Sequence, residues 1–230
     1  MLDLNEEFSN LISDKTVAIV GPAKSISGLN NGNMIDKYDT VVRLNYAKIE
    51  KPSDSGKRTD IIYYDGSFHD HKNQELKFLV CSYPETEWFF ESRCRNNINY
   101  YKNLYKHRIV SSHLYKNLKK SLDPKNKIRP NTGLIAILDV LLYNPKKVFI
   151  TGIDFYRTSY LKTHPDYGQK SLEFIKKQFS EGDSGDYHDP DKQYQLFKKL
   201  YLKNRDKLLL DEFMSNIIED SFYDSWNNKK

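Results

Sequence analysis

Three short segments of the chain hold residues whose types and spacing could do chemistry. In the first, Val17–Gly28, a β-branched run leads directly into a loop of small residues, Gly21-Pro-Ala-Lys-Ser25. Ligands of open α/β sheets bind beyond the carboxyl ends of the strands, so this loop could cradle a phosphate or a nucleotide. It matches neither the P-loop, which ends in Gly-Lys-Ser/Thr, nor the GxGxxG fingerprint. A tight structural turn accounts for the same residues equally well.

The second segment, Ile128–Ile135, predicts a turn followed by a helix N-terminus. Its proline and its glycine fix the turn, and Asn131 or Thr132 can cap the helix. A helix N-terminus presents free N–H groups that attract carboxylates and phosphates, and Arg129 adds a positive charge beside it. The alternative is a well-capped helix that binds no ligand.

The third segment is the strand end Phe149–Tyr156, which is followed by Tyr160, His164 and His188. Tyrosine hydroxyls can donate hydrogen bonds to a phosphate that carries no metal ion. A histidine, with a reference pKa of about 6.5, is suited to act as a general base. A lone histidine is, however, more often structural or exposed than catalytic.

The pair Asp189-Pro-Asp191 forms a D-x-D pattern, which metal-dependent sugar transferases use. The pattern lies where an amphipathic helix is expected to begin. An aspartate at that position caps the helix by accepting a hydrogen bond from its first turn. We therefore interpret Asp189 as an N-cap and predict no metal site.

The elements that must position these segments alternate along the chain. Short β-branched runs alternate with longer helical patterns, which is typical of an α/β protein with a mostly parallel sheet. The expected strands are Thr16–Val20, Thr40–Leu44, Asp60–Tyr64, Lys77–Ser82, Arg108–Ser111, Lys147–Ile153 and Lys207–Leu210. The expected helices are Glu85–Tyr105, His113–Leu122, Asn131–Tyr143 and Asp191–Lys203.

The polar segment Thr158–Tyr187 has the composition of a loop or lid, with a short helix near Ser171–Phe179. No shift in composition marks a domain boundary along the chain. We therefore expect a single domain over residues 1–230, with a lid-like segment over 157–187.

Composition narrows the function classes. The 230 residues carry a formal net charge of +5, but the basic residues are spread along the chain and are mostly lysine. Nucleic-acid binders concentrate such charge in a patch, so we expect no nucleic-acid partner, whereas an anionic small molecule or a membrane surface remains compatible. The 13% aromatic content excludes wholesale disorder. With only two cysteines, no signal-like start and no apolar stretch of membrane-spanning length, we expect a cytoplasmic protein.

Taken in order, the three segments resemble the sialyl motifs of sialyltransferases. Val17–Ala47 is similar to the large motif of glycosyltransferase family 29, and Arg129–Gly152 is similar to the small motif. Gly152-Ile-Asp-Phe-Tyr156 is closer to the bacterial family 42 enzymes, and His188-Asp189 is similar to the very small motif, which carries the catalytic base in both families.

The resemblance implies a Rossmann-like, GT-A-like, inverting transferase that needs no metal ion or other cofactor. Its donor would be CMP-sialic acid or a related CMP-activated sugar, and its acceptor a glycan of the lipooligosaccharide or capsule type. His188 would deprotonate the acceptor hydroxyl, and Tyr156 and Tyr160 would hold the departing phosphate. The other donor-binding residues implied are Gly21, Pro22, Ala23, Ser25, Asn45, Arg129, Asn131, Thr132, Gly133, Asp154 and His164. Such an acceptor is compatible with peripheral contact at the inner face of a membrane, and with an oligomer.

The chain departs from the family pattern at two positions near the implied site. Pro22 stands where an asparagine usually follows the first motif glycine, and Gln193 stands where an acidic residue is expected five positions after the base. Two alternatives stay open. One is a transferase that uses CMP-Kdo, and the other is a non-catalytic nucleotide- or sugar-binding module of the same fold.

Overall fold

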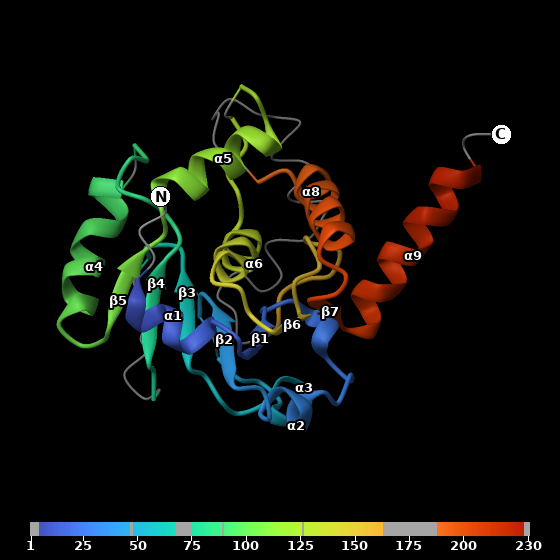
Figure 1. The fold of residues 1–230 in the computed structure, drawn as a ribbon, viewed down its shortest axis with the longest axis horizontal. Coiled ribbons are helices and arrows are strands. Elements are labelled where there is room, and N and C mark those ends of the chain that lie inside the picture. The colour runs from blue at the N-terminus through green and yellow to red at the C-terminus, as the bar shows by residue number, and fades with distance from the viewer. Residues whose placement is uncertain are drawn as a thin grey trace.

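A computed structural model describes residues 5–46, 48–67, 75–88, 90–125, 127–162 and 188–227 (Figure 1). Within these residues, seven strands form one sheet in which every neighbouring pair is parallel. The strands are β1 Thr16–Val20, β2 Thr40–Leu44, β3 Ile61–Tyr64, β4 Phe78–Cys81, β5 His107–Ile109, β6 Lys147–Thr151 and β7 Leu208–Leu210. The expected α/β fold with a parallel sheet is confirmed.

The strand order, β5-β4-β3-β2-β1-β6-β7, reverses at β1. The chain adds strands outward from β1 to β5, and then returns to place β6 and β7 on the other side of β1. Because all strands are parallel, their carboxyl ends meet at one edge of the sheet. The reversal between β1 and β6 creates a crevice position at that edge, where ligands of open α/β sheets bind.

Strand β1 is buried on both of its faces. Val17 and Ile19 contribute to the main core, while Ala18 and Val20 belong to a second, smaller core on the other face of the sheet. This alternation follows from the two-residue period of an extended strand. It explains why β1 is apolar throughout, as strands covered on both faces are.

The described helices flank this sheet. They are α1 Glu6–Ile12, α2 Gly32–Ile35, α3 Pro52–Ser55, α4 Arg95–Lys102, α5 Ser112–Leu122, α6 Thr132–Leu142, α8 Pro190–Lys203 and α9 Glu212–Asn227. Helices α1, α6 and α8 contribute buried residues to the main core, and α2 contributes to the smaller one. Helix α9 extends away from the rest of the ribbon (Figure 1). Among the described residues, no helix combines the length and apolarity that crossing a membrane requires.

The predicted helices at His113–Leu122, Asn131–Tyr143 and Asp191–Lys203 are confirmed to within two residues. The predicted helix Glu85–Tyr105 is too long, because the chain forms a π turn at Phe90–Cys94 before α4 begins. Helices α1 and α9 were not predicted. The short helix expected near Ser171–Phe179, and residues 163–187 of the lid-like segment, lie outside the described residues.

Strand β6 ends two residues earlier than predicted. Gly152 has a φ of +65°, which takes the chain out of the extended conformation directly after Thr151. Glycine adopts this left-handed conformation without the steric cost that a Cβ imposes. The residues from Gly152 onward therefore belong to the loop at the carboxyl edge of the sheet.

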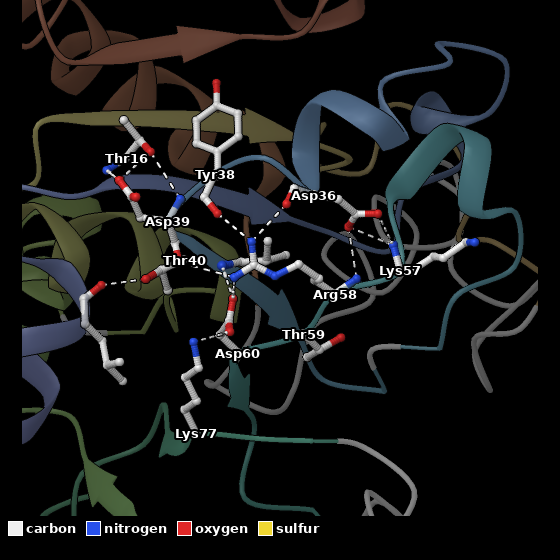
Figure 2. Close-up of polar contacts among 12 residues, drawn as sticks. Thr16, Asp36, Tyr38, Asp39, Thr40, Lys57, Arg58, Thr59, Asp60 and Lys77 are labelled. Carbon is white, nitrogen blue, oxygen red and sulfur yellow. Dashed lines mark hydrogen bonds and ion pairs between the residues drawn. The ribbon is translucent and has the colours of Figure 1, made fainter.

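At the opposite edge of the sheet, where the strands begin, the Arg58 guanidinium donates hydrogen bonds to several backbone and side-chain oxygens (Figure 2). It donates to the carbonyl oxygens of Asp36 at 2.9 Å and Tyr38 at 2.7 Å, and to Asp60 Oδ2 at 2.8 Å. Lys77 Nζ lies 2.8 Å from the other oxygen of the Asp60 carboxylate. Together, these hydrogen bonds and ion pairs link the segments that lead into β2, β3 and β4.

Candidate functional site at the carboxyl edge of the sheet

The backbones of Gly21 and Gly152 cross at the ends of β1 and β6. The Gly21 N–H donates to the Thr151 carbonyl at 2.8 Å, which extends the pairing of the two strands by one step. A Cβ on Gly21 would collide with the Gly152 carbonyl oxygen, so no larger residue fits there. This close approach fixes the floor of the crevice at the switch point.

The loop after β1 is bonded to the loop after β6 along its whole length. Ala23 N donates to the Gly152 carbonyl at 3.0 Å, and Lys24 N donates to the Ser159 carbonyl at 2.7 Å. Ser25 N donates to the hydroxyl of Thr158 at 3.0 Å. Because these N–H groups already have partners, the backbone of Gly21–Ser25, predicted to bind a phosphate or nucleotide, holds the two loops together.

Two further contacts complete the join between the loops. The Pro22 carbonyl accepts the Leu161 N–H at 2.9 Å, and Ala23 forms an antiparallel bridge with Tyr160. The structure thus gives Pro22 and Ala23 a positioning contact with the segment that carries Tyr160.

Asp154 anchors this second loop from within. Its Oδ2 accepts the N–H of Thr158 at 3.0 Å and also the Thr158 hydroxyl. The carboxyl is almost completely buried, and burial raises its pKa while the Thr158 hydrogen bonds oppose the shift. Asp154 therefore stabilises the turn rather than facing solvent.

Phe155 and Tyr156 both adopt left-handed backbone conformations, with φ values of +53° and +65°. Aromatic residues rarely occupy this region, and such strain persists only where the surroundings impose it. The Phe155 ring is buried against Tyr194 and Phe197 of α8, at centroid distances of 6.0 and 5.1 Å. Packing against α8 thus holds the turn that presents Tyr156.

The half-buried Tyr156 lies between two aromatic partners. Its ring centroid is 6.3 Å from that of Tyr160, in an edge-on arrangement, and 6.4 Å from that of His188, in a stacked arrangement. The three side chains come from the β6 loop and from the residue two positions before α8. The structure therefore brings Tyr156, Tyr160 and His188 together, as the sequence predicted.

His188 is oriented by the backbone of the second predicted segment. Its Nδ1 lies 2.8 Å from the Arg129 carbonyl oxygen. A carbonyl oxygen can only accept, so Nδ1 carries the proton in this contact and the lone pair of the neutral ring is on Nε2. The Arg129 guanidinium lies 5.5 Å from the ring centroid of Tyr83.

Asn131 is the N-cap of α6, which makes it the capping residue of the two that the sequence left open. Its side-chain oxygen accepts the Leu134 N–H at 2.8 Å, while the N–H groups of Thr132 and Gly133 donate to no described residue. Such a helix terminus attracts anions. A Cβ built on Gly133 would lie 3.0 Å from Ile153 Cγ2 and 3.4 Å from Leu44 Cδ1. The α6 N-terminus therefore packs directly against the ends of β6 and β2.

Asn45 follows β2 at the same edge. Its φ is +54°, and its N–H donates to the Tyr63 carbonyl at 2.7 Å. Its side-chain oxygen is buried and has no hydrogen-bond partner among the described residues. A buried acceptor without a donor is costly, and it is often explained by a ligand or a water molecule.

Asp189 caps α8 as predicted, because its Oδ1 accepts the Lys192 N–H at 3.0 Å. His164, predicted to bind the donor, lies outside the described residues. Among the described residues, no cluster of histidine, cysteine and acidic side chains could hold a metal ion.

Sequence reasoning missed two positions that the structure places in this region. Thr158 bridges Asp154 and the first loop, and Gln193 reaches across to the Arg129–Asn131 turn. Gln193 was visible only as a departure from the acidic residue of the motif. Thr158 carried no distinguishing signal, since it begins a polar segment.

The fold defines the chain as an α/β protein whose strand order reverses between β1 and β6, the position at which open sheets of this class bind ligands. The sequence profile of glycosyltransferase family 29 (sialyltransferase) matches residues 6–163. The match covers more than half of the chain, so the protein belongs to this family of glycosyltransferases, as the sequence motifs predicted. No curated protein sequence matches the chain.

Solved structures share the fold at low sequence identity. A mammalian sialyltransferase superposes with a TM-score of 0.57 and 17% identity, over 87% of this chain and 70% of that one. The sialyltransferase CstII from Campylobacter jejuni, in complex with cytidine-5'-monophosphate, gives 0.56 and 17%, over 86% of this chain and 80% of that one. The α-2,3-sialyltransferase Cst-I of the same organism gives 0.52 and 16%, over 92% and 78%.

Proposed function

We propose that this protein transfers sialic acid from CMP-sialic acid to a hydroxyl group of a glycan acceptor, with inversion and without a metal ion. Family membership supports the reaction class, and the CMP complex of the similar Campylobacter enzyme supports the nucleotide. The observation that carries the mechanism is the placement of His188, which is bonded through Nδ1 to the Arg129 carbonyl and stacked on Tyr156.

His188 is the general base of the proposed reaction. The Arg129 contact assigns the proton to Nδ1, so Nε2 can accept the proton of the acceptor hydroxyl. The acceptor oxygen forms a bond to the anomeric carbon while the bond from that carbon to the phosphate oxygen breaks. The proton stays on His188, and CMP departs as an anion.

The departing phosphate needs donors on the face of the sugar opposite the acceptor. Tyr156 and Tyr160 supply hydroxyl groups there, and the N–H groups of Thr132 and Gly133 supply a helix N-terminus. These neutral donors stabilise the negative charge that develops in an oxocarbenium-like transition state. They take the place that a divalent cation holds in metal-dependent transferases.

The nucleotide lies along the edge between β1, β2 and α6. The buried Asn45 oxygen, which has no donor in the described part of the chain, provides an acceptor for an amino or hydroxyl group of the cytidine. Gly21, Pro22, Ala23 and Ser25 shape the floor beneath it through the contacts that join the two loops. Arg129 adds positive charge, Asn131 caps the helix, and Asp154 holds the tyrosine loop in place. We also expect His164 to contact the donor.

The proposal is tested by incubating the protein with CMP-sialic acid and with CMP-Kdo, separately and in the presence of a glycan acceptor. CMP release is measured in each case, with and without EDTA. We expect acceptor-dependent release from CMP-sialic acid that EDTA does not change. Turnover of CMP-Kdo alone would move the donor assignment to that sugar. Release from neither donor would indicate a binding module that has kept the fold without the reaction.

A further inference from the structure

Gln193 spans the backbone turn that orients the proposed base. It is fully buried in the first turn of α8, and its Oε1 accepts the Asn131 N–H at 2.7 Å. Its Nε2 lies 3.4 Å from the Arg129 carbonyl oxygen, as a long hydrogen bond. That same oxygen is the one to which His188 Nδ1 donates. One side-chain amide therefore contacts both ends of the turn between the base and the N-cap of α6.

We propose that Gln193 is a positioning residue with two roles. Through the Arg129 carbonyl it fixes the Nδ1-protonated form of His188, and through the Asn131 N–H it holds the N-terminus of α6 in place relative to His188. This inference rests on the proposed function, because it assigns Gln193 to the reaction of His188. It goes further by giving a purpose to the residue that departs from the acidic pattern.

The chemistry of the two contacts selects an amide. The Asn131 N–H needs an acceptor and the Arg129 carbonyl can accept a second donor, and a neutral amide of this length offers both in one group. A carboxylate would present an oxygen to the Arg129 carbonyl, and the two would repel. A methionine of similar length would leave the Asn131 N–H without a partner.

The charge of the residue at 193 also affects the base. The Tyr156 phenol ring stacks on the His188 ring, Tyr160 lies edge-on to Tyr156, and the Asp189 carboxylate is adjacent in sequence. The guanidinium groups of Arg129 and Arg157 lie over the rings of Tyr83 and Tyr194. The Asp189 carboxylate is turned to the α8 N–H groups as their cap. Adding a buried carboxylate at 193 would favour the imidazolium and raise the pKa of His188 by about one unit.

The test compares Gln193→Met and Gln193→Glu with matched changes at Gln195, which is exposed on the same helix. We expect Gln193→Met to lower kcat at least about tenfold, and Gln193→Glu to move the acid limb of the kcat profile upward by about one pH unit. Gln195→Met and Gln195→Glu should leave both unchanged.

Nitrogen chemical shifts of the His188 ring, measured without substrate, provide a readout besides activity. Wild type should show the Nδ1-protonated neutral form, and Gln193→Met should populate the Nε2-protonated one. A folded Gln193→Met protein with wild-type kcat and ring shifts would overturn the inference, as would a lower Tm with both unchanged. If Gln193→Met does not fold, the Gln193→Glu pH profile and ring titration decide alone. Turnover that survives His188→Ala would instead refute the proposed base. The His188 ring shifts in the Gln193 variants would still test the role of Gln193.

Discussion

The two edges of the sheet are built in opposite ways. At the amino-end edge, Arg58 and Lys77 hold the Asp60 carboxylate from both sides, and Thr16 donates twice to Asp39, from N–H at 2.8 Å and from the hydroxyl at 2.7 Å (Figure 2). At the carboxyl edge, the Asn45 oxygen is buried without a donor from any residue that the structure describes, and Tyr156 has a left-handed backbone.

The difference indicates that the two edges of the sheet have different roles. Paired charges and hydrogen bonds at the strand starts stabilise the fold, whereas unpartnered and strained groups at the strand ends suit a ligand that supplies the missing contacts. The left-handed residues before the strand starts, Asp14 and Asn144, are of types that tolerate this conformation, whereas the aromatic Phe155 and Tyr156 are not. Such a violation of local rules is expected where function lies.

The largest effect is expected for His188→Ala at the carboxyl edge. Loss of a positioned general base should lower kcat by roughly a hundred- to ten-thousand-fold. The Tm should change little, since the half-buried ring contributes to no core. Steady-state CMP release and a thermal melt measure the two quantities. His113→Ala, on the exposed face of α5, is the matched control and should keep wild-type turnover.

Tyr156→Phe tests the leaving-group side of the same edge. The ring stays in place, so packing against Tyr160 and His188 is kept, but the hydroxyl donor is lost. We expect kcat to fall roughly ten- to a hundredfold, in line with the loss of one donor to a developing anion. A variant as fast as wild type would remove Tyr156 from the mechanism and leave the helix N-terminus as the anion site.

Arg58→Met tests the amino-end edge. It removes the ion pair to Asp60 and the hydrogen bonds to the Asp36 and Tyr38 carbonyls. Because the Arg58 side chain is 37% exposed, the expected loss is about 2 kcal/mol of unfolding free energy, below that of a fully buried pair. Denaturant titration measures it, with the exposed Lys57→Met as control. CMP release per folded molecule should stay at the wild-type value, and a specific loss of turnover would break the division between the edges.

The smallest effect concerns pH, and it separates stability from activity. Burial lowers the pKa of His107 to about 4, while its unfolded value is about 6.5. The unfolded chain therefore binds the extra proton between these values, so stability is complete above pH 6.5 and falls as pH drops toward 4. The loss between pH 8 and pH 6 should be on the order of 1 kcal/mol. Chemical denaturation at both pH values checks it, and His107→Phe should flatten the dependence.

Most strands were predictable because they are short, largely β-branched or apolar runs bounded by polar or turn residues, whereas β5, His107–Ile109, is half-buried and begins one residue before its predicted start. The bounds of β1 and β2 match the prediction residue for residue. The helix over Glu85–Tyr105 was overextended, since periodicity does not reveal a π turn. Helix α1 was missed because only Phe8 and Ile12 of its seven residues are buried, which is too few for a helical period.

The members of the candidate site could be proposed from the sequence, but their contacts could not. The motifs identified Tyr156, Tyr160, His188 and the α6 N-terminus. The role of Gln193 depends on a hydrogen bond to a residue 62 positions away, which no local pattern encodes. The hydrogen bonds between the loop after β1 and the loop after β6 were likewise not predictable, because Ser25 and Thr158 are separated by 133 positions.

The most direct test of the division between the edges is CMP titration followed by backbone amide chemical shifts. The account predicts saturable shifts at Asn45, Thr132 and Gly133, weaker shifts at the same positions with UMP or GMP, and none at Arg58 or Lys77. Shifts at the amino-end edge, or no shifts at the carboxyl edge at saturating CMP, would contradict it.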